Sequence, residues 1–188
     1  METLLAWDKA VFLWLNSLGS PPFDGFWLML THKATNILLY LLLWIFFLYK
    51  NHWKTGISLL FFTGFLILFT DQFTNLFKVS FGRLRPCNDP TLQALLRLVK
   101  PRCGGGYSFF SGHASNSFAL AVFFGALLKP YFRGLPYLLL FIAALIAYSR
   151  IYIGVHFPLD ILCGTIAGCS IGFGFIKLWG LFKGRFLQ

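Results

Sequence analysis

Five long apolar stretches make up most of this chain, and they constrain its fold more than any other feature. A helix that crosses a bilayer needs about 20 mainly apolar residues, because in lipid its backbone must satisfy its own hydrogen bonds. The stretches therefore predict an all-α, polytopic membrane helical bundle. The predicted spans are Phe26–Tyr49, Thr55–Phe77, His113–Lys129, Leu135–Arg150 and Phe157–Phe182.

The first 20 residues contain a further apolar segment, Leu4–Leu18, which carries Asp8 and Lys9. Two charges within an apolar helix are typical of a helix that lies in the membrane interface. We therefore expect an interfacial helix within residues 1–20, with a sixth span as the alternative. No polar or Pro/Gly-rich linker divides the chain, so residues 1–188 are expected to form a single domain.

Composition agrees with a membrane protein and narrows the class of partner. Only 12% of the residues are charged, against about 25% in ordinary soluble domains. The net charge is +10, but no run of five basic residues occurs. This pattern argues against nucleic acid and favours membrane lipids and an anionic headgroup or phosphate as partners; no obligate protein partner is evident.

The predicted spans divide the charged residues unequally between the two sides of the membrane. One side carries basic residues and no acid, whereas the other carries all six acids and nine Lys and Arg. Several of those nine are candidates for a site, so we discount them from the count. Short basic loops then mark the cytoplasmic side, and the acid-bearing side is expected to face outward. The purely basic side holds Lys50, Lys54, Lys129, Arg133, Lys177, Lys183 and Arg185.

Three polar clusters lie at the ends of predicted spans, within residues 71–170, and all fall on the acid-bearing side. They are Lys78–Pro86, Phe110–His113 and Ser149–Asp160. Polar residues at such positions are costly in lipid and are functional candidates by default. Because successive spans alternate in direction, the three clusters are expected to meet at one site.

The residue types in these clusters are those that bind phosphate. Lys78, Arg85 and Arg150 supply three cations, and the guanidinium fork of arginine matches phosphate oxygens. Ser111 and Gly112 fall at the start of a predicted helix, where free N–H groups and the helix dipole favour an anion. The sequence therefore predicts a phosphate site.

Two histidines and an aspartate add the chemistry of phosphate transfer. His156 and Asp160 are four residues apart, which places them on one side of a helical turn near Pro158. The carboxylate would orient the imidazole, leaving its other nitrogen free to attack phosphorus. His113 is then the candidate general acid for the leaving alcohol. The expected intermediate is a phosphohistidine on His156.

These clusters resemble the three signatures of the type 2 phosphatidic acid phosphatase superfamily. Lys78–Pro86 fits the pattern KX6RP, and Ser149–Asp160 fits SRX5HX3D in full. Phe110–His113 resembles PSGH, with Phe110 in place of the usual proline. Three spaced signatures in the same order are far more specific than any one of them.

The resemblance implies a metal-independent reaction with no cofactor and a lipid phosphate or pyrophosphate as substrate. The leading function is hydrolysis of a lipid of the undecaprenyl diphosphate, phosphatidylglycerophosphate, phosphatidic acid or lipid A type. A lipid phosphotransferase and a non-catalytic lipid- or phosphate-binding membrane protein are the alternatives. The short loops resemble bacterial members, which implies the inner membrane with the site facing the periplasm.

Four further residues beside the clusters are candidates for supporting roles. Arg83 is expected either to snorkel to the interface or to support the phosphate ligands from behind. Asp71 lies on the same helical face as Lys78 and would hold it in place, or pair with another basic residue. Cys87 and Cys103 bracket a loop on the outer side, where an oxidising compartment would allow a disulfide in place of two thiols. No Cys/His spacing suits a zinc site.

Overall fold

The computed structural model describes residues 2–100 and 102–186. Within this part of the chain the regular structure is entirely helical, with seven α-helices and two short 3₁₀ helices. The α-helices are α1 (Glu2–Ser17), α2 (Asp24–Leu30), α3 (Lys33–Lys50), α4 (Trp53–Phe81), α5 (Gly112–Leu128), α6 (Leu135–Tyr152) and α7 (Pro158–Phe186). The 3₁₀ helices are η1 (Pro21–Phe23) and η2 (Pro86–Asn88).

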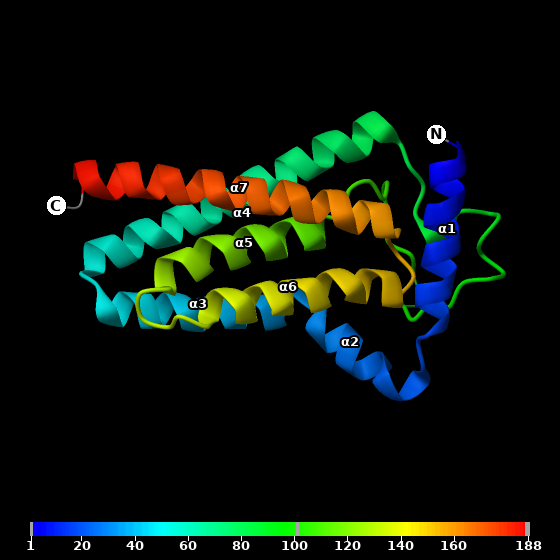
Figure 1. The fold of residues 1–188 in the computed structure, drawn as a ribbon, viewed down its shortest axis with the longest axis horizontal. Coiled ribbons are helices and arrows are strands. Elements are labelled where there is room, and N and C mark those ends of the chain that lie inside the picture. The colour runs from blue at the N-terminus through cyan, green and yellow to red at the C-terminus, as the bar shows by residue number, and fades with distance from the viewer. Residues whose placement is uncertain (1, 101, 187–188) are drawn as a thin grey trace.

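Helices α3 to α7 run along the long axis of the molecule as one bundle, and α1 lies across one end of it (Figure 1). Four of them, α3, α4, α6 and α7, are long and apolar enough to cross a membrane. The fifth, α5, has 17 residues and packs against α4, α6 and α7 in the middle of the bundle. The prediction of an all-α membrane helical bundle is confirmed.

The first predicted span, Phe26–Tyr49, is wrong as a single helix, because the chain breaks at Thr31 and His32. His32 adopts an extended conformation, and its side chain accepts a hydrogen bond from the Ala34 N–H, so that it caps the start of α3. The Asn36 side chain donates to the carbonyl oxygens of Leu30 and His32 on the other side of the break. Helix α2 therefore turns away from α3 (Figure 1).

Helix α1 has the character of an interfacial helix. Its buried face carries Asp8, Phe12 and Asn16, at intervals of four residues. Its outer face is apolar, and Trp7 and Trp14 are 67% and 62% exposed. Tryptophan side chains are favoured at the membrane–water interface, which agrees with a helix that lies flat across the end of the bundle (Figure 1).

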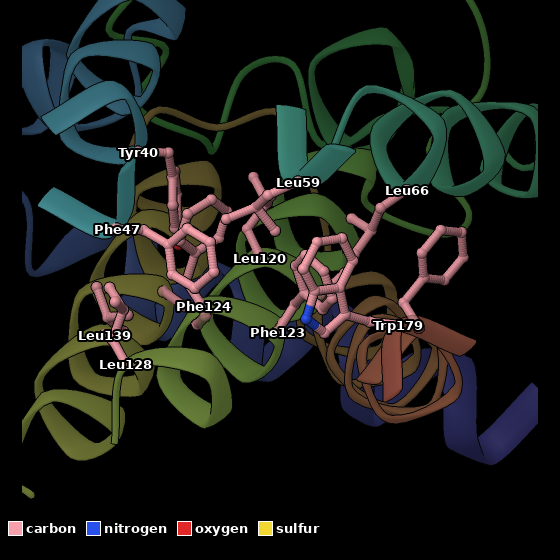
Figure 2. Close-up of a cluster of buried hydrophobic side chains, with 14 residues drawn as sticks. Tyr40, Phe47, Leu59, Leu66, Leu120, Phe123, Phe124, Leu128, Leu139 and Trp179 are labelled. Atoms are coloured by element: carbon pink, nitrogen blue, oxygen red, sulfur yellow. The ribbon is translucent and has the colours of Figure 1, made fainter. Parts of the chain in front are cut away.

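A hydrophobic core fills the half of the bundle away from α1. Figure 2 shows its aromatic and aliphatic side chains, which come from five different helices and interlock around α5. Phe123, Phe124 and Leu128 of α5 are almost completely buried in it. The largest members from the other helices are Tyr40, Phe47, Leu59, Leu66, Leu139 and Trp179.

Helices α5 and α7 approach each other closely through a glycine stripe on α7. A Cβ placed on Gly164 or Gly172 would lie 2.7 or 2.8 Å from the carbonyl oxygens of Ser111 or Ala119, and Gly168 is packed still closer against Ser115. Small residues at every fourth position allow membrane helices to pack backbone to backbone. This packing holds the starts of α5 and α7 together.

The two ends of the bundle differ in charge, as the sequence predicts. The α3–α4 turn, the α5–α6 turn and the end of α7 lie together at the end away from α1 (Figure 1). These are the segments that carry basic residues and no acid. The three polar clusters lie at the opposite end, beside α1.

Candidate active site

The three polar clusters contribute to one cavity of about 420 Å³ at the α1 end of the bundle. The cavity extends along α3 and α4 beyond these clusters. The three motifs contain nine candidate site residues. Six of them line the cavity directly: Lys78, Arg85, Gly112, His113, Arg150 and His156.

A glycine turn places Lys78 and Arg85 on the same cavity. Helix α4 ends at Phe81, and Gly82 takes a left-handed conformation (φ 57°) while its N–H donates to the carbonyl oxygen of Lys78. The chain then runs back along the cavity to Arg85, directly before η2. Ser108 holds this segment by donating its N–H to the carbonyl oxygen of Arg83 over 2.7 Å.

The start of α5 forms part of the cavity wall. Ser111 caps the helix by accepting a hydrogen bond from the Ala114 N–H over 3.4 Å, and its own N–H donates to the carbonyl oxygen of Asp160. Gly112 and His113 line the cavity, whereas Ser111 is fully buried behind them. Of the predicted Ser-Gly-His group, Gly112 and His113 are therefore the residues that an anion would meet first.

His156 lies directly before α7 and is 1% exposed. Its Nδ1 lies 3.3 Å from Oδ2 of Asp160, which also accepts a hydrogen bond from the Phe157 N–H. With Nδ1 protonated toward the carboxylate, Nε2 carries the lone pair. Burial lowers the pKa of His156 to about 4, so the imidazole is neutral at physiological pH.

Arg83 joins Asp160 to helix α1. Its Nη1 donates to Oδ1 of Asp160 over 2.9 Å, and its Nη2 pairs with Oδ2 of Asp8. The other oxygen of Asp8 accepts a hydrogen bond from the Leu159 N–H, and the guanidinium lies 4.1 Å from the Phe157 ring centroid. Arg83 therefore supports the aspartate behind His156.

The cations of the cavity have far fewer partners. Arg150 is 6% exposed, and its Nη1 donates to the Thr31 hydroxyl over 2.7 Å. Its Nε and that of Arg85 are buried with no hydrogen-bond partner among the described residues. Burial also lowers the pKa of Arg85. Buried cations without partners favour an anion, so this side of the cavity, called the binding side below, is the candidate site for a phosphate.

Asp71 does not form the ion pair that the sequence suggested with Lys78 or another base. Within the described residues its carboxylate makes no salt bridge; its Oδ1 accepts a hydrogen bond from the Asn116 side chain over 2.7 Å.

The loop beyond Arg85 is closed by a disulfide between Cys87 and Cys103, whose Cα atoms are 5.6 Å apart.

Several polar residues at the site lie outside the motifs and were not predicted from the sequence; they include Asp8, Thr31, Lys33, Asn36 and Asn116. The spacing of Asp8, Phe12 and Asn16 on one face of α1 could have indicated that this face meets protein. Thr31 and Asn116 carry no comparable signal. In the part of the chain that the structure describes, no three His, Cys, Asp or Glu side chains are grouped as metal ligands would be.

The fold and the site together define a membrane-embedded phosphatase: a helical bundle with a histidine and a cationic cavity at one end. Comparison with known proteins identifies the family, because the model of the PAP2 superfamily matches residues 58–183. The chain belongs to this superfamily, the one that its sequence signatures resemble.

Individual relatives are phosphatases of lipids. The chain is 32% identical to the lipid A 4′-phosphatase of Porphyromonas gingivalis over 188 residues, which cover 100% of this chain and 79% of the relative. It is 36% identical to the lipid A 4′-phosphatase of Bacteroides thetaiotaomicron over 177 residues, 93% of this chain and 76% of the relative. The crystal structure of Aquifex aeolicus LpxE superposes with a TM-score of 0.69 at 26% identity, covering 90% and 94% of the two chains. The predicted family and enzyme class are confirmed: the chain is an integral membrane lipid phosphatase.

Proposed function

We propose that this enzyme removes a phosphate monoester from a lipid of the lipid A type, through a phosphohistidine on His156. The lipid type is supported by the two lipid A 4′-phosphatases that resemble the chain over most of its length. The observation that carries the mechanism is the arrangement of His156 and His113 on one cavity with Lys78, Arg85 and Arg150.

An apolar groove beside the cavity supports a lipid substrate. It has a volume of about 210 Å³ and runs between α3, α4 and α5. Cavity and groove share Asn36, Ile37, Tyr40, Ile67 and Leu120. A lipid with its phosphate among the cations could therefore place part of an acyl chain in the groove without leaving the bilayer.

In the first step of the reaction, Nε2 of neutral His156 attacks phosphorus and forms an N–P bond. The P–O bond to the lipid breaks, and His113 donates its proton to the departing alkoxide. A bound phosphate dianion beside His113 favours the protonated form that this step needs. Arg85, Arg150 and Lys78 stabilise the charge on the transferring phosphoryl oxygens.

In the second step, water attacks the phosphohistidine. His113, now neutral, accepts a proton from the water, and the N–P bond breaks to release inorganic phosphate. Asp160 keeps the His156 imidazole in the required tautomer through both steps, as the aspartate of a catalytic triad does.

We further propose that the site faces the periplasm from the bacterial inner membrane. The segments at the other end of the bundle carry Lys and Arg without acids, and such short basic loops remain in the cytoplasm. Labelling of Cys87 and Cys103 from outside intact cells after reduction would test this orientation; labelling only in opened cells would reverse it.

The direct test of the proposed function is phosphate release by the purified protein in detergent. The wild type should release phosphate from a lipid A-type monophosphate in the presence of EDTA. His156→Ala should reduce kcat by at least about 10³-fold, because the nucleophile is lost. Turnover by His156→Ala at the wild-type rate would sink the mechanism, and transfer of the phosphate to a second lipid in place of water would make the enzyme a phosphotransferase.

A further inference from the structure

A polar pair joins α4 to α5 on the wall of the cavity, between the cations and the apolar groove. Asp71 of α4 and Asn116 of α5 both line the cavity, and the Asn116 Nδ2 donates to Asp71 Oδ1. Asp71 precedes Lys78 by seven residues, roughly 10 Å of helix toward the middle of the bilayer. An ionisable side chain at this depth is costly and is by default a functional candidate.

The pair has acceptor oxygens that the protein leaves unused. Asn116 Oδ1 is buried with no hydrogen-bond partner among the described residues. Within the same residues Asp71 makes no ion pair, and only one of its oxygens, Oδ1, has a side-chain donor. The buried Asn116 oxygen lacks the donor that such an atom normally has, and the more exposed Asp71 carboxylate adds a second acceptor beside it on the cavity.

The position of the pair matches one part of an amphiphilic substrate. Asp71 lies one helical turn from Ile67, and Asn116 lies one turn from Leu120; Ile67 and Leu120 line both the cavity and the apolar groove. On the other side of the pair, His113 and Lys78 line the phosphate end. A lipid that spans both ends must pass the pair with the atoms that connect its phosphate to its acyl chains.

We propose that Asp71 and Asn116 form a subsite for a hydrogen-bond donor, an amide N–H or a hydroxyl, carried by the lipid next to its phosphate ester. The inference rests on the proposed function and specifies the headgroup class. An acylated amino sugar, such as that of lipid A, carries donors of this kind. A diacylglycerol phosphate carries only ester oxygens there, which a carboxylate and an amide oxygen repel.

The sharpest test compares two lipid monophosphates that differ in one group: an acylglucosamine phosphate with an amide-linked chain and its analogue with an ester-linked chain. The wild type should prefer the amide by about ten-fold or more in kcat/KM, because the ester leaves the buried Asn116 oxygen and the Asp71 carboxylate beside it without a donor from the substrate. Asp71→Asn and Asn116→Leu should each remove most of this preference, mainly by slowing turnover of the amide.

Gln72→Leu is the matched control. Gln72 lies at the same depth on α4 and is exposed like Asp71, but it does not line the cavity, so its replacement should leave the preference unchanged. Equal losses on both substrates in Asp71→Asn and Asn116→Leu would mean that the pair only links α4 to α5, which overturns the inference. A wild type that hydrolyses both lipids without preference would also overturn it, with the proposed reaction intact. No turnover of either lipid would reject the proposed substrate type and the subsite with it.

Discussion

The two sides of the cavity are built in opposite ways. One side, called the nucleophile side here, carries the proposed nucleophile. On it His156, Asp160, Arg83 and Asp8 form a continuous chain of hydrogen bonds and ion pairs, in which the Asp8 and Asp160 side chains are 2% and 0% exposed. Each carboxylate has partners for both of its oxygens. This side is complete without a ligand.

On the binding side the cations lack hydrogen-bond and ion-pair partners. Arg85 and Arg150 each have a buried Nε without a partner among the described residues, and within the same part of the chain Lys78 forms no salt bridge. Like charges held together in a buried position are unfavourable until an anion arrives. In the proposed mechanism this contrast has a purpose: the protein itself orients the proposed nucleophile, His156, whereas the substrate phosphate would supply the missing partners of the cations.

The largest expected difference comes from removing one arginine from each side. Arg83→Met and Arg85→Met should both reduce kcat/KM by about 10²-fold or more. Only Arg83→Met should also destabilise the fold, by about 3 kcal/mol, because it leaves two buried carboxylates unpaired. Thermal unfolding in detergent should then show a Tm lower by roughly 6–12 °C for Arg83→Met, and an unchanged or higher Tm for Arg85→Met.

Asp8→Asn is an intermediate variant on the nucleophile side. It keeps the shape of the side chain and an oxygen for the Leu159 N–H, but removes the charge that pairs with Arg83. Its losses of activity and stability should lie between those of the wild type and Arg83→Met. If Arg85→Met lost as much stability as Arg83→Met, the two sides would not differ in the way described.

Inorganic phosphate should stabilise the binding side, with a smaller effect. A ligand that binds only the folded protein adds about 2.7 kcal/mol at 100 times its Kd, so the Tm of the wild type should rise with phosphate concentration. Arg85→Met should show little or no rise, whereas Asp8→Asn should keep it. A rise of equal size in all three proteins would place phosphate outside the cavity.

The residues of the binding side could be predicted from the sequence, whereas the contacts that support Asp160 on the nucleophile side could not. Lys78, Arg85 and Arg150 fall in spaced motifs at the ends of apolar runs, and alternating spans bring such ends together. The support of Asp160 depends instead on how α1 docks. The pattern of α1 indicates an interfacial helix but not its direction, so the contact between Asp8 and Arg83 could not be derived.

The other errors have the same physical origin. Asp71 and Lys78 share a helical face, yet the hydrogen bond of Asp71 is made to Asn116 of another helix. Helical periodicity indicates which residues share a face, but it does not identify the neighbour across that face. The break at Thr31 and His32 was hidden for a similar reason. It depends on the His32 side chain, which accepts a hydrogen bond from the Ala34 N–H, and on the Asn36 side chain, which donates to the Leu30 carbonyl oxygen, within a mainly apolar stretch.

The smallest expected effect is that of acid on the nucleophile. The proposed attack requires neutral His156, and burial lowers the pKa of this residue to about 4. As pH falls from 7 to 5.5, His156 should stay neutral, so its titration should leave kcat/KM almost unchanged. A nucleophilic histidine of ordinary pKa would lower kcat/KM about ten-fold over the same range. The measurement is kcat/KM between pH 4 and 8, corrected for titration of the substrate phosphate. Asp160 favours the protonated form of His156, so the acidic limb should move to still lower pH in Asp160→Asn; a limb near pH 6.5 in the wild type would show that the nucleophile side is open to water.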